Sequence, residues 1–191
     1  MAEPAKTRAT YQDLYAIPEN TTGEIIDGEL VVTPRPSPEH AAAAARLGGE
    51  IVPIYDFGRG GGPGGWIILD EPEIMFGGRG APLIPDLAGW KKERFVRSKA
   101  HNWIDAIPDW ICEVLSPGTA KRDKFTKMSI YRESPELHHV WLVDPLNRTL
   151  EVFGREETGR WITLSFFAEA DTVRAAPFLE AEFALSELWL D

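Results

Sequence analysis

The sequence contains a single cysteine, Cys112, among its 191 residues. One cysteine cannot form an intramolecular disulfide, so a disulfide-stapled fold and a cluster of thiolate metal ligands are both excluded. Cys112 stands inside an apolar run, and we interpret it as a small buried hydrophobic side chain. The missing disulfide framework fits a reducing compartment, and we expect a cytoplasmic protein.

Long apolar runs are also absent. No stretch approaches the ~18 apolar residues of a membrane-spanning helix, and residues 1–6 lack the hydrophobic core of a signal peptide. We therefore expect a soluble protein with no membrane partner. With 43% hydrophobic residues, the chain can bury one sizeable core but is short for two. We predict a single domain over residues 1–191, in which residues 1–9 form a disordered tail.

Basic residues are scarce, because 20 Lys and Arg stand against 30 Asp and Glu and the net charge is −10. This balance argues at first against a polyanionic partner, since nucleic-acid binding depends on neutralising phosphates. The distribution changes that conclusion. Residues 91–132 hold ten basic and five acidic side chains, whereas the rest of the chain holds ten and 25. This basic segment is compatible with an anion-binding face and equally with an ordinary solvated surface.

The most informative stretch, residues 108–131, predicts a buried strand, a sharp turn and a helix. Its apolar run over 110–115 ends at a Ser-Pro-Gly breaker, which is typical of a central strand covered on both faces. Glu113 interrupts this run on the face of Ile111 and Leu115. An unpaired carboxylate there would carry a heavy desolvation cost, so Glu113 needs a cation.

The helix predicted over 119–132, with Thr119 as its N-cap, supplies that cation. On a helical wheel Lys127 falls between Ile130 and Tyr131, within an apolar arc that also holds Met128 and Phe125. We therefore expect Lys127 to face inward.

Weaker signals predict the remaining elements. Asp27-Gly28 favours a type I′ hairpin turn, and Ser37 followed by Pro38 favours a helix start. The glycine run over 58–65 lacks a phosphate-loop ending and is interpreted as a connector. The predicted elements are a short helix over 11–17, a hairpin over 24–32, a helix over 38–55, strands over 66–69, 73–76, 83–88, 139–144, 149–153 and 161–166, and a C-terminal helix over 185–190.

Geometry selects the acid that shares a site with Glu113. Asp109 lies four residues away on the same strand, which separates the two by about 13 Å. Two ligands of one Mg²⁺ must both place an oxygen within about 2.1 Å of the ion. Asp109 is thereby excluded as the second ligand of a metal bound by Glu113. The candidate for that ligand is Asp86, a carboxylate among apolar residues on a neighbouring predicted strand.

Two acids and a lysine suit metal-assisted cleavage of a phosphodiester. Asp86 and Glu113 would hold Mg²⁺ or Mn²⁺, and Lys127 would orient the attacking water or stabilise the transition state. The competing interpretation is a buried Glu113–Lys127 ion pair that serves structure only. His40, in the first turn of the helix over 38–55, is compatible with an ordinary surface or capping histidine.

Several motifs, taken in order, resemble the Uma-type endonucleases of the PD-(D/E)XK, restriction-endonuclease-like superfamily. The resemblance covers roughly residues 20–155. The motifs are Asp27-Gly28-Glu-Leu, Ser37-Pro38-Glu-His40, Pro85-Asp86-Leu, Pro108-Asp109-Trp-Ile-Cys-Glu113-Val-Leu-Ser116-Pro117, the trio Asp123, Lys127 and Tyr131, and Val140-Trp141-Leu-Val-Asp144-Pro145.

The resemblance implies an α/β (mixed α+β) fold with a restriction-endonuclease-like core, in which helices flank a central mixed sheet. It implies that Asp86 and Glu113 are the metal-binding acids and that Glu24 assists from the first strand. The superfamily's usual lysine position is Leu115 here, and the resemblance moves that role to Lys127.

The function implied is a Mg²⁺-dependent endonuclease acting on DNA, and a homodimer is left open. A catalytically silent module that binds nucleic acid or protein is the alternative. His40 and Tyr131 are auxiliary candidates, and Lys121, Arg122 and Lys124 are candidate phosphate contacts.

Overall fold

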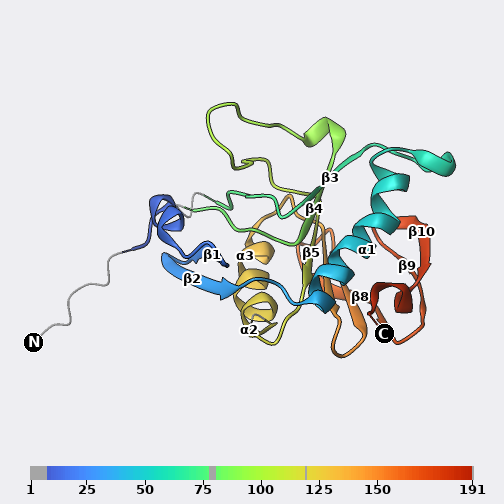
Figure 1. The fold of residues 1–191 in the computed structure, drawn as a ribbon. Helices are drawn as coiled ribbons and strands as arrows, with labels where there is room; N and C mark the ends of the chain where they lie inside the picture. The colour runs from blue at the N-terminus through green and yellow to red at the C-terminus, as the bar shows by residue number, and fades with distance from the viewer. Residues whose placement is uncertain (1–7, 78–80, 119, 191) are drawn as a thin grey trace, which may run out of the picture.

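A computed structural model describes residues 8–77, 81–118 and 120–190 of the chain. Its centre is a six-stranded mixed sheet with the strand order β3-β4-β5-β6-β7-β8 (Figure 1). β5 and β6 run parallel, and the other neighbours are antiparallel. The strands are β3 (Trp66–Asp70), β4 (Leu87–Lys91), β5 (Trp110–Val114), β6 (His139–Asp144), β7 (Thr149–Arg155) and β8 (Trp161–Ala168).

Two small hairpins and a set of helices surround this sheet. The elements are η1 (Tyr11–Ala16), β1 (Thr21–Ile26), β2 (Glu29–Pro34), α1 (Pro38–Tyr55), η2 (Arg59–Gly61), η3 (Lys92–Arg94), α2 (Ala120–Arg122), η4 (Asp123–Lys127), α3 (Met128–Glu133), β9 (Thr172–Ala175), β10 (Phe178–Ala184) and η5 (Leu185–Leu188). β1 pairs with β2, and β9 pairs with β10.

The sheet carries one apolar core on each face. α1, the β9–β10 hairpin and η5 cover the face that receives Trp110, Cys112 and Trp141. α3 covers the other face, which receives Ile111, Leu115 and Val140. Figure 1 shows α1 and α3 on opposite sides of β5. β5 is therefore buried on both faces, as its continuous apolar sequence predicts.

Most of the predicted elements are confirmed, and the local chemistry explains them. The Asp27-Gly28 pair joins β1 to β2 with φ angles of 53° and 86°, the left-handed values that a type I′ turn requires. The Ser37 side chain accepts a hydrogen bond from the backbone N–H of His40, so α1 begins at Pro38 as expected. Cys112 is fully buried, and no described helix is long and apolar enough to cross a membrane.

The prediction of one regular α-helix over 119–132 is wrong. A π-helical turn, η4, separates α2 from α3, and the Met128 N–H bonds to the carbonyl of Asp123 five residues earlier. A π-turn holds more residues than an α-turn, so it shifts the faces of the residues before and after it. Lys127 still faces inward, but Phe125 is 69% exposed instead of buried. The N-cap prediction at Thr119 lies outside the described residues.

Other predicted boundaries also need correction. Residues 73–76 form isolated bridges of Ile74 instead of a strand, and the strand predicted over 83–88 begins at Leu87. The C-terminal helix is one 3₁₀ turn, η5, and the β9–β10 hairpin was not predicted. Most of the tail predicted over residues 1–9 lies outside the described residues, and residues 8 and 9 precede η1 without regular structure.

Candidate active site

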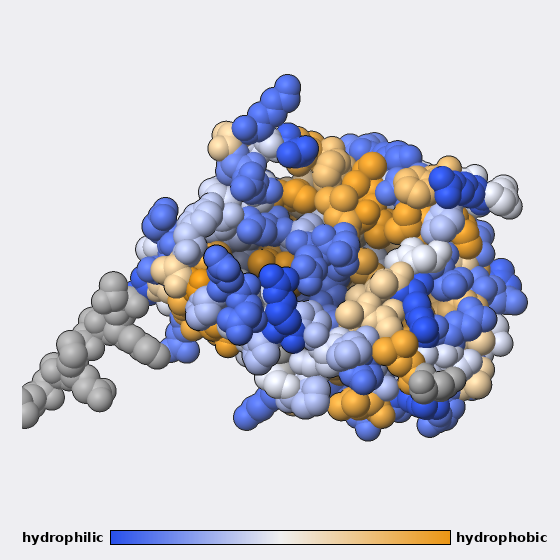
Figure 2. Space-filling model, viewed as in Figure 1, coloured by the Kyte–Doolittle hydropathy of each residue, from blue (hydrophilic) through white to orange (hydrophobic). Residues whose placement is uncertain are grey.

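Asp86, Glu113 and Lys127 come from three separate segments of the chain and line one cavity of about 570 Å³. Asp86 immediately precedes β4, Glu113 lies on β5, and Lys127 ends the π-turn η4. The antiparallel register of β4 and β5 places Leu87 beside Cys112, which brings Asp86 to the carboxyl end of β5. In Figure 2 hydrophilic side chains gather around a hollow between the β1–β2 hairpin and the start of α1.

Glu113 is 2% exposed and accepts two hydrogen bonds at its carboxylate. Lys127 Nζ donates to Oε2 at 3.2 Å, and the hydroxyl of Tyr131 donates to Oε1. Tyr131 lies one helical turn after Lys127, so both side chains reach the same carboxylate from the same helix face. The expectation that Glu113 would need a buried cation is confirmed.

Lys127 is 3% exposed and lies among three carboxylates. Its Nζ is 3.0 Å from Glu24 Oε1, 3.2 Å from Glu113 Oε2 and 3.7 Å from Asp123 Oδ1. It also donates to the carbonyl of Ile84 at 3.2 Å. Glu24 Oε1 in turn accepts the backbone N–H of Ile84 at 3.0 Å, which ties the β1–β2 hairpin to the floor of the cavity.

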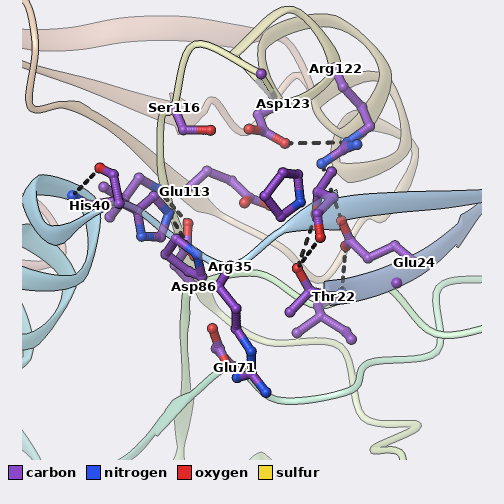
Figure 3. A pocket seen from close by; sticks show the side chains of 18 of the residues that line it. Thr22, Glu24, Arg35, His40, Glu71, Asp86, Glu113, Ser116, Arg122 and Asp123 are labelled. Atoms are coloured by element: carbon purple, nitrogen blue, oxygen red, sulfur yellow. Dashed lines mark hydrogen bonds and ion pairs between the residues drawn. The ribbon is translucent and has the colours of Figure 1, made fainter. Parts of the chain in front are cut away.

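Asp86 is held by two donors from different elements (Figure 3). Its Oδ2 accepts the backbone N–H of Val114 at 2.6 Å, and its Oδ1 lies 3.2 Å from His40 Nε2. His40 is 9% exposed, so it is a buried partner of Asp86 and not a surface or capping histidine. Asp86 therefore enters the cavity in a fixed orientation.

The pKa values follow from this crowding of charges. Burial raises the pKa of the Glu113 carboxyl well above its usual range, and the nearby ammonium of Lys127 acts in the opposite direction. Burial acts to lower the pKa of Lys127, but the carboxylates of Glu113 and Glu24 outweigh it and raise that pKa. For His40, burial is likewise outweighed by the hydrogen bond to Asp86, so its pKa is raised.

Asp109 lies at the other end of β5, and the cavity lining includes Glu113 but not Asp109. Its carboxylate accepts a charge-assisted hydrogen bond from Arg94 and the backbone N–H of Lys91 at 2.9 Å. The sequence argument that separated Asp109 from Glu113 agrees with this arrangement.

The three basic residues predicted as phosphate contacts lie in different environments. Arg122 lines the cavity, Lys124 pairs with Glu151 at 3.5 Å, and Lys121 is exposed on α2. Arg35 was not identified from the sequence, although it lines the same cavity. Its position between two prolines and next to the Ser-Pro-Glu-His motif is the signal that could have identified it.

The acids of the cavity outnumber its cations. Among the described residues the lining includes six carboxylates but only three Lys or Arg side chains. The carboxylates are those of Glu24, Glu71, Glu73, Asp86, Glu113 and Asp123, and the cations are those of Arg35, Arg122 and Lys127. An excess of hard oxygen donors suits a divalent cation such as Mg²⁺.

Within the described ranges, no group of three or more His, Cys, Asp or Glu side chains is arranged to hold a metal ion by itself. This is compatible with the usual coordination of Mg²⁺, which is bound by one or two carboxylates and completes its shell with water and substrate oxygens. Asp86 and Glu113 are two of the carboxylates that line this cavity, and a Mg²⁺ or Mn²⁺ ion held by them would have to complete its shell with water or substrate oxygens.

Comparisons with known proteins agree with the fold and with the family that the motifs resemble. The Uma2 family, described as "Putative restriction endonuclease", matches residues 8–187. No curated protein matches the chain. Among solved structures, one described as "a putative nuclease" from Anabaena variabilis ATCC 29413 has a TM-score of 0.69 and 22% sequence identity, and the match covers 94% of this chain and 97% of that one. The mixed α+β, nuclease-like fold that the resemblance implied is thus confirmed, and the chain belongs to the Uma2 family.

Proposed function

We propose that this protein is a divalent-metal-dependent endonuclease that hydrolyses phosphodiester bonds of DNA. The observation that carries the proposal is the convergence of Asp86, Glu113 and Lys127 on one cavity from three separate segments of the chain. Family membership supports a nuclease, and the excess of carboxylates supports a metal cofactor. Membership alone leaves the reaction open, because one fold hosts many functions.

Asp86 and Glu113 are the residues that would hold Mg²⁺ or Mn²⁺. When bound, such an ion supplies charge neutralisation at phosphorus and a lowered pKa for the attacking water. The chain fixes both ligands beforehand: Val114 N–H and His40 orient Asp86, and Tyr131 orients Glu113. Pre-oriented groups of this kind lower the reorganisation needed in the transition state.

Lys127 is the one cation buried beside Glu113 among the described residues that line the cavity. In the proposed reaction its ammonium stabilises the negative charge that develops on the phosphoryl oxygens. Leu115, two positions after Glu113, is apolar and 3% exposed, so it cannot supply that charge.

A second candidate function is a binding module that keeps the nuclease fold without the reaction. One observation favours it: the contacts of Lys127 to Glu24, Glu113 and the Ile84 carbonyl use all three ammonium protons. A lysine whose three ammonium protons are all bonded to protein groups has a structural role. For catalysis it must release at least one of these partners when metal and substrate bind.

Plasmid cleavage with Mg²⁺ or Mn²⁺ tests the two candidates. We expect the parent protein to nick or cut DNA, and Asp86→Asn and Glu113→Gln to lose turnover together with calorimetric Mn²⁺ binding. Glu182→Gln, an exposed acid on β10, is the matched control and should behave as the parent. A parent that cuts no DNA with either metal would contradict the nuclease and favour the binding module.

A further inference from the structure

We propose that Arg35 and Arg122 form a clamp that binds backbone phosphates of the DNA strand entering the cavity. The inference rests on the proposed function and adds the residues that position the substrate. Figure 3 shows the two arginines in different parts of the site, with Arg122 beyond Glu24 and Asp123 at the upper right and Arg35 extending down toward Glu71. Both line the same cavity, although they come from segments 87 positions apart in the sequence.

Arg35 is presented by an unusually stiff segment. It follows Pro34, the last residue of β2, and precedes Pro36, and another proline, Pro38, opens α1. Proline fixes its own φ angle, and a residue before proline is restricted to extended conformations. The backbone at Arg35 therefore has little conformational freedom to lose when a ligand binds.

The guanidinium of Arg35 also makes few hydrogen bonds to the described residues. Its one hydrogen bond to the described residues runs from Nη2 to the carbonyl of Glu19 at 3.5 Å, the limit for such a bond. Its charge acts on Glu71, whose pKa it lowers against the larger effect of burial. A guanidinium carries five N–H donors in a planar fork that matches phosphate oxygens. Most of the donors of Arg35 are thus available to a ligand in the cavity.

Arg122, which lines the same cavity, also has donors without a close partner in the described part of the chain. Its Nη2 is 3.7 Å from Glu24 Oε2 and its Nε is 3.9 Å from Asp123 Oδ1, so both ion pairs are longer than hydrogen bonds. The Nε atom is buried and has no hydrogen-bond partner among the described residues. A buried donor left in this way is costly, and a phosphate oxygen would satisfy it.

The other cations near the cavity are committed elsewhere. Lys127 is saturated by its acidic neighbours, and Lys124 pairs with Glu151. Arg35 and Arg122 are therefore the cations of the described lining with unused donors. The carboxylates of the cavity would repel a phosphate approaching alone, so the clamp should bind DNA more tightly when a divalent cation is present.

Fluorescence anisotropy with a labelled 20-nucleotide DNA, single-stranded and as a duplex, tests the clamp in EDTA and in Ca²⁺. A gel run afterwards establishes that the DNA is intact. We expect Ca²⁺ to tighten binding of the parent protein. Arg35→Gln and Arg122→Gln should each weaken binding about tenfold for the form that the parent prefers, and should lower the salt slope by about 0.7–0.9. Arg35→Lys, which keeps the charge but loses the fork, should fall between Arg35→Gln and the parent.

Arg160→Gln is the matched control, because it removes the same charge from a side chain that is 73% exposed and pairs with Glu156 outside the cavity. It should bind as the parent does. Thermal unfolding identifies any variant that fails to fold, and Arg35→Gln, at an exposed position, keeps the test informative if Arg122→Gln does not fold.

Equal DNA binding by the parent, Arg35→Gln and Arg122→Gln would overturn the clamp and leave the nuclease proposal standing. A parent that binds DNA through both arginines but never cuts it would overturn the nuclease and leave the clamp. A parent that binds neither form of DNA in Ca²⁺ at low salt would overturn the clamp as well.

Discussion

The two ends of β5 each hold a buried acid with a basic partner, yet they differ in what surrounds the pair. At the amino end, Asp109 is 5% exposed and is satisfied by Arg94 and by the backbone N–H of Lys91. At the carboxyl end, Glu113 is 2% exposed and shares Lys127 with other carboxylates beside a cavity. The first pair balances one acid with one base, whereas the second leaves negative charge in excess.

This difference shows which features set Glu113, the acid of the proposed site, apart from a buried acid with an ordinary ion pair. Both acids are buried, both are preceded within five residues by proline, and both have a cation in contact. Burial and pairing with a cation are therefore not sufficient to distinguish the two acids. The distinguishing features are an unbalanced charge and access from a cavity, which are the features a ligand would use.

The largest expected effect is at the cavity end. Lys127→Ala should lower the free energy of unfolding in EDTA by about 3–5 kcal/mol, because it leaves buried carboxylates without their cation. Added Mn²⁺ should restore more stability to this variant than to the parent, since the metal replaces the lost charge. Thermal unfolding with and without Mn²⁺ measures both effects.

Lys124→Ala is the control for that experiment. It removes a lysine from the same π-turn, but its pair with Glu151 is partly exposed and should be worth less than about 1 kcal/mol. A Lys127→Ala protein as stable as the parent in EDTA would remove the distinction between the two ends of β5.

At the amino end, Asp109→Ala should cost about 3 kcal/mol, because Arg94 and the Lys91 N–H lose their acceptor. Mn²⁺ binding per folded molecule should be unchanged, in contrast to Glu113→Gln. Chemical denaturation and calorimetry measure the two quantities. Loss of Mn²⁺ binding in Asp109→Ala at full stability would show that this end also belongs to the site.

The amino end should also respond to acid through His139, whose backbone N–H bonds to the carbonyl of Asp109. Burial lowers the pKa of His139 from 6.5 to about 4. The unfolded chain therefore binds more protons than the folded one between these values, so stability falls as the pH drops below 6.5. The contribution should reach about 2 kcal/mol at pH 5.

Denaturation curves of the parent and His139→Gln between pH 5 and pH 7.5 measure this effect. The variant should lose less stability on acidification, because it has no imidazole to protonate. Parallel pH profiles for the two proteins would contradict the assignment to His139.

The smallest expected effect concerns the hydroxyl of Tyr131. Tyr131→Phe removes the donor to Glu113 and should cost about 1.5 kcal/mol. It should also weaken Mn²⁺ binding a few-fold, because the Glu113 carboxylate is then less well oriented. Tyr55→Phe is a matched control, since the Tyr55 hydroxyl contacts Glu180 outside this cavity. If both variants bind Mn²⁺ as the parent does, Tyr131 has only a structural role.

Local sequence patterns predicted much of this architecture. The Asp27-Gly28 turn, the Ser37 cap and the apolar run of β5 were confirmed because each depends on neighbouring residues alone. The β9–β10 hairpin was missed, and its core-facing side chains are stabilised by packing on α1, which no local pattern reports. The π-turn was missed for a related reason, since an α-helical wheel assumes a constant angle per residue.

The sequence by itself determined that a buried carboxylate on β5 needs a cation, and the spacing on one strand excluded Asp109 as its partner in a metal site. Those conclusions follow from desolvation and strand geometry, which act along the chain. Only the tertiary structure decided that Glu24, Asp123 and His40 join the same cluster and that Arg35 and Arg122 line the same cavity. Contacts between residues far apart in sequence depend on how the hairpin, the sheet and the helices pack, and that packing is set by the two cores together.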